Sequence, residues 1–424
     1  MEYRGDKEKR GVKRTDLVGA PESVYAGLRE TGFNTLIHTQ AGDGWSYCIK
    51  GSAPQQIDLD ELDGLVTKKD RPIHDDDAPP LQEGWLLFLS YDLCRDFENI
   101  PSKNPEMISM PKIMLCEIHE LLAYDHANGI WWTNSKDLND IDQHVDAEEF
   151  HIGEWEEAPT RDEYISMVEK AKEYIAAGDI YQVNLARWFS AEFSGDSFAL
   201  YRNLVRRNPS PYGFYAEIKI DDRKLDFVSV SPELLIQRTR DKLITRPIAG
   251  TYPKNLSIED LPRDPKERAE HIMLIDLERN DLGRIADFGS VEVTEFLGVE
   301  EYSHLYHIVS QVEARDSEGI KISELLGSVF PGGTITRTPK IRAMEIINEL
   351  ERFERGPYTG TVGFLTPSGD ITLNIVIRTA YVANDQIHVA AGSGIVADSI
   401  PEKEAAESAI KAAAILELKD LIPA

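Results

Sequence analysis

The sequence has few cysteines and no long apolar run. Its three cysteines, Cys48, Cys94 and Cys116, are odd in number and form no Cys-x-x-Cys pair, which is typical of reduced, structural thiols. The charged N-terminus is not followed by an apolar segment, so a secretory signal is not expected. No apolar run reaches the length of a membrane span. These absences predict a cytoplasmic protein that does not act in a membrane.

Basic residues are also scarce beside acidic ones. The chain has 46 Lys and Arg against 74 Asp and Glu, a formal net charge of -28. Such a surface repels a phosphate backbone, so we expect no nucleic-acid partner. An anionic substrate would need a local group of basic side chains or a metal ion. With 424 residues, 42% of them hydrophobic, the chain can bury the core of one large domain or of two domains.

Residues 246–281 carry the first chemical signal. A glycine-containing strand end at residues 247–251 precedes a helix that we expect to begin at Pro265, with Asp264 as its cap. Glu267 stands at the capping-box position and Glu270 follows three residues later, which puts both carboxylates on one helix face. Like charges this close repel unless water solvates them or a cation lies between them.

The same arrangement returns near the C-terminus. Ser399 is the expected cap of a last helix, with Glu402 at its box position and Glu404 and Glu407 on one face. Each pair alone is typical of a solvated helix face. Together the two pairs could direct four carboxylates at one divalent cation, of which Mg²⁺ would use one or two.

Strand and helix patterns are mixed along the whole chain. An amphipathic helix is expected after Thr160, with Glu163 in its capping box and Gly178 at its end. The acidic segment 135–158 is the best candidate linker, which suggests a companion region at 1–150 and a catalytic region at 151–424. Long antiparallel runs with interspersed helices predict an α+β fold. Early strands are expected at 33–39, 45–51, 84–93 and 112–126.

Several longer motifs identify a family. From Gly178 onward the chain reads, in order, DIYQVNL, VSPELL, RPIAGT, DPKERAEHIMLIDLERND, FPGGTITRTPKIRAMEII, RGPYTGTVGF and AGSGIVADSIPEKEAAES. This series resembles the chorismate-utilising enzymes, and residues 1–150 look like the companion domain of their aminating members. The resemblance implies a large two-sheet sandwich with outer helices, the fold of anthranilate synthase component I. It also implies chorismate as substrate and Mg²⁺ as cofactor.

The resemblance implies roles for individual residues. Those matching the catalytic positions are Glu233, expected to assist loss of the 4-hydroxyl, His307 near the ring, and Gln182. Those matching the Mg²⁺ site are Glu267, Glu270, Glu404 and Glu407. Those matching substrate contacts are Thr251, Thr334, Tyr358, Arg378, Lys411 and the backbone around Gly392 and Gly394. Taken singly, a histidine, tyrosine or arginine of this kind is more often structural, and the motif context supports function.

Gln182 separates the branches of the family. The water-using branch is expected to carry a lysine base at this position, and an amide cannot act as a base, so ammonia is the expected nucleophile. QVNL, FPGG and residues 36–39 resemble the aminodeoxychorismate synthases, which make 4-amino-4-deoxychorismate for 4-aminobenzoate and folate synthesis. Anthranilate synthase component I is the alternative. A non-catalytic relative that binds chorismate or tryptophan is a third possibility.

Three features depart from the expected motifs, and the first two count against the favoured branch. Ala249 stands where some aminodeoxychorismate synthases have a lysine proposed as a covalent nucleophile, and residues 208–215 have an anthranilate-synthase character. Arg337 stands where the motif commonly has glycine. Its bulk and charge either change the local geometry or contact an anionic ligand.

The sequence also bears on partners. No cysteine lies in a glycine-rich nucleophile turn, so ammonia is expected from a separate glutamine amidotransferase subunit. A tryptophan pocket of unknown role is expected around Leu36, His38, Pro211 and Tyr212.

Overall fold

The structure is a computed structural model. It describes residues 11–40, 44–67, 77–102, 104–135, 149–253, 265–301 and 305–420. Within these ranges, no helix combines the length and apolar character needed to cross a bilayer.

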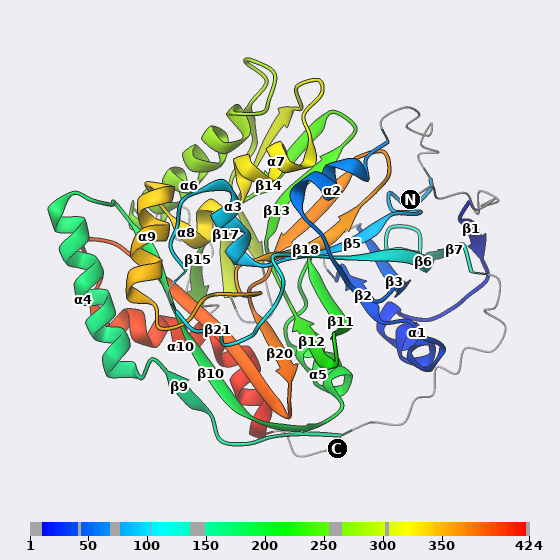
Figure 1. Cartoon of the computed structure of the whole chain (residues 1–424), viewed down its shortest axis with the longest axis horizontal. Coiled ribbons are helices and arrows are strands. Elements are labelled where there is room, and N and C mark those ends of the chain that lie inside the picture. The colour runs from blue at the N-terminus through cyan, green and yellow to red at the C-terminus, as the bar shows by residue number, and fades with distance from the viewer. Residues whose placement is uncertain are drawn as a thin grey trace.

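The strands form one continuous antiparallel array that folds into two stacked sheets joined by a single long strand (Figure 1). The first sheet contains β1 (Lys13–Thr15), β7 (Ile130–Thr133), β6 (Ile113–Asp125), β3 (Trp45–Gly51), β2 (Thr35–His38), β11 (Gly213–Ile220), β12 (Arg223–Ser229), β20 (Thr379–Ala383), β21 (Gln386–Ile395) and β10 (Val183–Gly195) in this spatial order, with β8 (Phe150–Ile152) and β9 (Glu156–Ala158) both paired to β10.

The second sheet starts from the same β6. It continues through β5 (Trp85–Leu89), β18 (Thr361–Leu365), β19 (Ile371–Ile375), β13 (Leu234–Thr239), β14 (Lys242–Arg246) and β17 (Leu305–Arg315), with β15 (Ile248–Pro253) and β16 (Glu292–Glu301) also on β17 and β4 (Gln55–Gln56) on β6. Residues 113–117 of β6 pair in the second sheet and residues 118–125 in the first, so one long strand connects both sheets.

The sandwich core lies between the two sheets, because side chains alternate along each strand. In β5, Leu86 and Phe88 face the first sheet, where the ring of Phe88 lies 5.5 Å from that of Phe227. Leu87 and Leu89 of the same strand face the outer helices. The predicted α+β fold with two stacked sheets is therefore confirmed.

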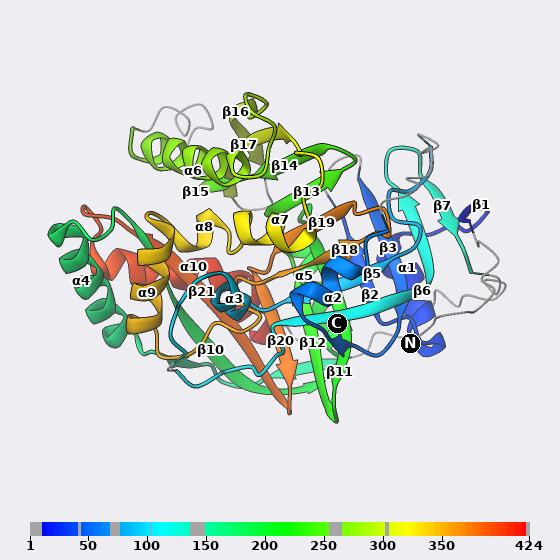
Figure 2. The ribbon, with the colours of Figure 1, turned by 45° about the horizontal axis from the view of Figure 1, so that its top comes forward.

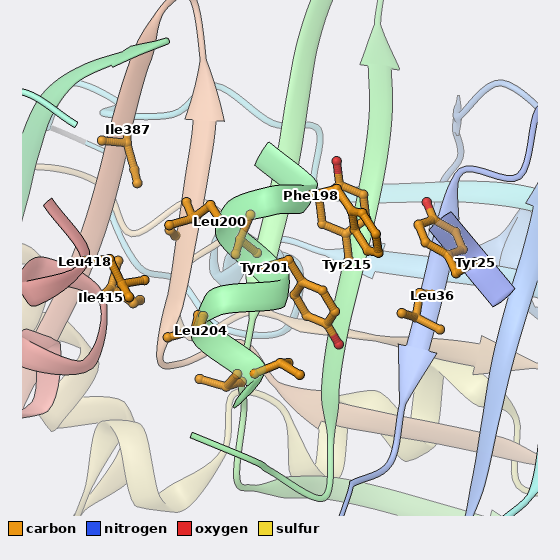
Figure 3. Packing of buried hydrophobic residues seen from close by; sticks show 14 of the residues in the cluster. Tyr25, Leu36, Phe198, Leu200, Tyr201, Leu204, Tyr215, Ile387, Ile415 and Leu418 are labelled. Atoms are coloured by element: carbon orange, nitrogen blue, oxygen red, sulfur yellow. The ribbon is translucent and has the colours of Figure 1, made fainter. Parts of the chain in front are cut away.

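Helices cover both outer faces. They are α1 (Pro21–Leu28), α2 (Leu59–Gly64), α3 (Cys94–Phe97), α4 (Arg161–Ala177), α5 (Ser197–Arg207), α6 (Pro265–Gly283), α7 (Ile322–Val329), α8 (Gly333–Thr336), α9 (Lys340–Leu350) and α10 (Pro401–Leu416). Helices α1, α5 and α10 pack on the first sheet and α2, α3, α6 and α7 on the second. Figure 3 shows α5 inserting Phe198 and Tyr201 toward Tyr25 and Tyr215, while Leu200 and Leu204 lie on the side of α10.

The helices that carry the predicted site residues lie at the end of the molecule that contains α4 and α9. Helix α4 begins as expected, with the Thr160–Glu163 capping box, and ends at Gly178 with φ 82°. Helix α8 lies between α6 and α10 in both ribbon views (Figures 1 and 2). Three segments that are distant in the sequence therefore meet around α8.

The predicted N-terminal caps of α6 and α10 have different outcomes. Helix α6 begins at Pro265 as expected, and Asp264 lies outside the described residues. Helix α10 begins at Pro401 after Ile400, so Ser399 is not its cap. The Ser399 hydroxyl instead accepts a hydrogen bond from the Val396 N–H in the preceding turn, because the proline fixes the helix start two residues later.

The predicted linker is partly structured. Residues 136–148 lie outside the described part, while β8 and β9 both pair with β10. The companion and catalytic regions share strand pairs, since β2 pairs with β11 and β5 with β18. The domain boundary near residue 150 stays a prediction.

Candidate active site

A cavity of about 440 Å³ opens between α6, α8 and α10, above β21 and β17. It brings together most of the site residues predicted from the sequence. Those on its wall are Glu233, Glu267, Glu270, His307, Thr334, Tyr358, Arg378, Gly392, Gly394, Glu404, Glu407 and Lys411.

Glu233 is the most deeply buried carboxyl group in this cavity. It lies in the segment between β12 and β13, and 4% of the residue is exposed. Burial disfavours the ionised form and raises the pKa of Glu233 to about 7. Hydrogen bonds from Thr334 and from the backbone of Ile248, and then the charges of Arg337 and Arg378, act in the opposite direction. The side chain can therefore hold a proton near neutral pH, as a general acid must.

His307 and Arg378 form a polar pair on the wall of the same cavity. Nη2 of Arg378 lies 3.0 Å from Nε2 of His307. A guanidinium can only donate, so Nε2 of the histidine accepts, which describes a neutral imidazole with its proton on Nδ1. Arg378 adopts φ 49°, in the left-handed region, which directs its side chain from a turn into the cavity.

The two glycines of β21 allow close approach of groups on both sides. A Cβ at Gly394 would lie 2.7 Å from Nε2 of Gln182 and 3.1 Å from Nη2 of Arg337. A Cβ at Gly392 would lie 2.4 Å from the backbone oxygen of Leu185 on β10. Lys411 donates to the Gly392 carbonyl over 3.2 Å, so α10 is fixed to the strand beneath the cavity.

Gln182 lies directly behind the cavity wall. It immediately precedes β10, is fully buried, and donates from Nε2 to Oε1 of Glu270 over 3.1 Å. Within the described part of the chain its own Oε1 is buried without a hydrogen-bond partner. The amide is thus held against one of the predicted metal ligands.

Arg337 reaches the same carboxylate from the end of α8. Its Nη2 lies 3.2 Å from Oε1 of Glu270. The backbone has φ 91° and ψ -158°, a conformation that glycine adopts readily and that costs other residues about 1–3 kcal/mol. The guanidinium, which the sequence identified as a departure, is therefore part of the cavity wall.

Four carboxylates from α6 and α10 line one side of the cavity. Oε1 of Glu407 is paired with Lys411 at 2.8 Å, and Glu270 with Arg337. Oε2 of Glu404 is buried with no hydrogen-bond partner among the described residues. Carboxylate oxygens, one of them unpartnered, are the donors that Mg²⁺ prefers, so the residues fit this cation. No three acidic, histidine or cysteine side chains in the described ranges converge on one point, so water or substrate would complete the coordination.

The structure describes the side chains of two further predicted substrate contacts, Tyr358 and Thr334, but not that of Thr251. The buried Tyr358 hydroxyl has a raised pKa because of desolvation, so it stays protonated and can donate. The buried hydroxyl of Thr334 lies beside the carboxyl group of Glu233, and a hydrogen bond from it favours the ionised form of that group. Thr251 lies on β15, and its side chain is outside the described part of the structure.

Only two of the four residues predicted for a tryptophan pocket line one cavity. A second cavity of about 400 Å³ is lined by Pro211 and Tyr212, but Leu36 and His38 do not line it. Leu36 packs in the core beneath α1 and α5, and Nδ1 of His38 lies 3.0 Å from the Tyr201 hydroxyl. Alternation along β2 sends these two side chains to the helix-covered face, while their neighbours Ile37 and Thr39 line the cavity.

Some wall and support residues were not predicted. Asn184, two residues after Gln182 on the same strand face, donates to the Ile335 carbonyl at 3.2 Å and holds α8. Arg355 donates to that carbonyl at 2.9 Å and is paired with Glu351 at 2.6 Å, both fully within the core. Side chains two residues apart in a strand share a face, so the position of Gln182 could have indicated Asn184. No sequence pattern indicates the ion pair between Arg355 and Glu351.

Comparison with known proteins identifies what this arrangement resembles. A protein-family model described as chorismate binding enzyme matches residues 28–417. Anthranilate synthase component 1 of Aquifex aeolicus is 37% identical over 93% of this chain and 91% of its own. Aminodeoxychorismate synthase component 1 of Bacillus subtilis is 39% identical over 80% of this chain and 77% of its own. The crystal structure of anthranilate synthase component I from Streptococcus pneumoniae matches with a TM-score of 0.76 at 28% identity, covering 98% of this chain and 94% of that one.

Proposed function

Because the chain belongs to the family of chorismate binding enzymes, we propose that it aminates chorismate with ammonia and gives 4-amino-4-deoxychorismate and water. The amination rests on one observation. Gln182 is a neutral amide that donates a hydrogen bond to Glu270. It stands at the position where the water-using branch is expected to carry a lysine base. An amide cannot take a proton from water, whereas ammonia needs no activation to attack.

The cavity residues suit a substrate with two carboxylates and a hydroxyl leaving group. Arg378 offers a planar fork for one carboxylate, and the hydroxyls of Tyr358 and Thr334 can donate to neighbouring oxygens. Glu233, with a pKa of about 7, holds the proton that the departing 4-hydroxyl needs to leave as water.

We further propose that Mg²⁺ binds on the side formed by α6 and α10, where one or two of the carboxylates of Glu267, Glu270, Glu404 and Glu407 would hold it and water or substrate oxygens would complete its coordination. When bound, the cation would supply positive charge to a substrate carboxylate and help the leaving group depart. Oε2 of Glu404, which has no hydrogen-bond partner among the described residues, supports this assignment.

The choice of product has support on both sides. QVNL, FPGG and residues 36–39 favour 4-amino-4-deoxychorismate. Ala249 favours the second candidate, conversion of chorismate and ammonia into anthranilate, pyruvate and water, because it lines the cavity where a lysine nucleophile would stand. Relatives with each activity have 37–39% identity to this chain, so overall similarity does not choose between them.

Ammonia would come from a partner. Both relatives are named component 1, which implies a second component. We propose that this component is a glutamine amidotransferase subunit and that free ammonium salts replace it in an assay.

Product analysis tests the proposal. The purified chain is incubated with chorismate, Mg²⁺ and ammonium chloride at alkaline pH, with Glu233→Gln and an ammonium-free reaction as controls, and the products are separated with mass detection. Formation of 4-amino-4-deoxychorismate, which keeps its enolpyruvyl group, is the expected result. If anthranilate and pyruvate form instead, the second candidate function replaces the first. Absence of any turnover, with chorismate still bound, would favour a non-catalytic relative.

A further inference from the structure

Arg337 is kept at a position whose backbone favours glycine. Its φ of 91° and ψ of -158° lie in a region that side chains with a Cβ rarely occupy, and 7% of the residue is exposed. It follows α8 directly, and α8 is fixed from below by Asn184 and Arg355 through the Ile335 carbonyl. The rest of the site therefore holds an unfavourable backbone conformation in place, which suggests that the side chain has a function.

The guanidinium uses only part of its hydrogen-bonding capacity. Nη2 lies 3.2 Å from Oε1 of Glu270, whereas Nε and Nη1 are buried with no hydrogen-bond partner among the described residues. Buried charged donors without partners are unfavourable unless a ligand accepts from them. Because Arg337 lines the cavity, a ligand in the cavity can supply that acceptor.

The charged side chains around the cavity indicate which group can bind an anionic ligand. Five glutamates line it, so a substrate with two carboxylates needs basic groups to offset the repulsion. Lys411 is paired with Glu407, Arg378 contacts His307, and Lys403 is on the exposed side of α10. Arg337 is a buried cation with donors that no described group uses.

We propose that Arg337 binds a carboxylate of the substrate at the Glu270 end of the cavity, a contact that adds to the one expected from Arg378. Glu270 orients the guanidinium through Nη2, and the remaining nitrogens donate to the substrate carboxylate. This inference rests on the proposed function, because chorismate is the dicarboxylate that the cavity is proposed to take. The guanidinium and a divalent cation would share Glu270, so the test must separate their effects.

Calorimetric titration of chorismate, without ammonium, tests the contact. The unmodified chain and Arg337→Gly are compared in a chelator and in Mg²⁺. Glycine suits the backbone at this position, so thermal unfolding of the variant should show no loss of stability. We expect Arg337→Gly to bind chorismate about 10- to 100-fold more weakly in both buffers, because a charge-assisted contact is removed.

Two further variants separate direct contact from general charge. Lys403→Ala removes a positive charge from the exposed side of the same cavity and should change the affinity less than about threefold. Arg337→Lys keeps the charge without the planar fork and should fall between the unmodified chain and Arg337→Gly. Affinities of the unmodified chain and Arg337→Gly within about twofold, or a loss seen only with Mg²⁺, would overturn the inference. Failure of the unmodified chain to bind chorismate in either buffer would instead reject the proposed function, and this inference with it.

Discussion

Gln182 and Glu270 are joined by a single hydrogen bond, from Nε2 to Oε1 over 3.1 Å, behind the wall of the cavity. The same glutamate oxygen is 3.2 Å from Nη2 of Arg337. One carboxylate thus connects Gln182, which we propose distinguishes ammonia from water chemistry, with Arg337, which departs from the family motif, and with the predicted Mg²⁺ site. A substitution at Gln182 that keeps the contact with Glu270 should therefore alter the choice of nucleophile and leave the contact between Arg337 and Glu270 in place.

Gln182→Lys tests this relationship. A lysine here can keep the contact with Glu270 and, in its neutral form, accept a proton from water, so we expect isochorismate to form from chorismate in ammonium-free buffer. The product is identified by chromatography with mass detection. Gln182→Met, which has similar length but no base, is the control. Isochorismate from neither variant, or equally from both, would contradict Gln182 as the base position and leave the family membership intact.

Glu233→Gln tests the proton donor. The amide keeps the shape of the side chain but has no acidic proton to give, so kcat should fall about 10²- to 10⁴-fold while chorismate affinity changes little. Glu233 carries its proton below its pKa of about 7, so kcat/KM of the unmodified chain at constant free ammonia should fall above that pH. The variant's residual rate should lack this decline. Unchanged turnover would remove Glu233 as the acid.

The same substitution should change stability with pH. Burial raises the pKa of Glu233 from 4.5 to about 7, so the folded state holds this proton more tightly than the unfolded state. The resulting stability is fully present below pH 4.5 and is lost as pH rises to about 7, a change of roughly 3 kcal/mol. Glu233→Gln lacks this dependence, so its free energy of unfolding relative to the unmodified chain should increase by about that amount between these pH values. Denaturant unfolding at both pH values measures it, and a constant difference would contradict the assigned pKa.

Some parts of this structure follow from local sequence and others do not. The α4 cap at Thr160 and the start of α6 at Pro265 depend on neighbouring residues only, and both were predictable. The prediction of Ser399 as a cap was wrong because Pro401 fixes the start of α10 two residues later, and the Ser399 hydroxyl accepts a hydrogen bond in the preceding turn. The long motifs predicted which residues share a cavity, since they carry the family's chemistry in fixed order.

Features that depend on distant contacts were not predictable. β2 is buried on both faces, so its alternation could not show whether Leu36 or Ile37 faces the second cavity. Arg337 was identified as unusual, but its contact with Glu270 arises only when α8 comes between α6 and α10. The buried Arg355–Glu351 pair supports α8 from below and has no sequence pattern of its own.

Glu407→Ala and Glu270→Ala test the metal site and should differ in stability. The Glu407 side chain is 45% exposed, and its partner Lys411 still donates to the Gly392 carbonyl, so its loss should hardly affect thermal unfolding. Loss of Glu270, 18% exposed, leaves the buried donors of Gln182 and Arg337 without this acceptor and should cost about 1–3 kcal/mol. Calorimetric titration with Mg²⁺ should show affinity at least about tenfold weaker in both variants. Glu402→Ala, on the exposed side of α10, is the matched control and should bind Mg²⁺ normally. If Glu407→Ala also binds Mg²⁺ normally, Glu407 is not a ligand, and its carboxylate serves only to balance the charge of Lys411.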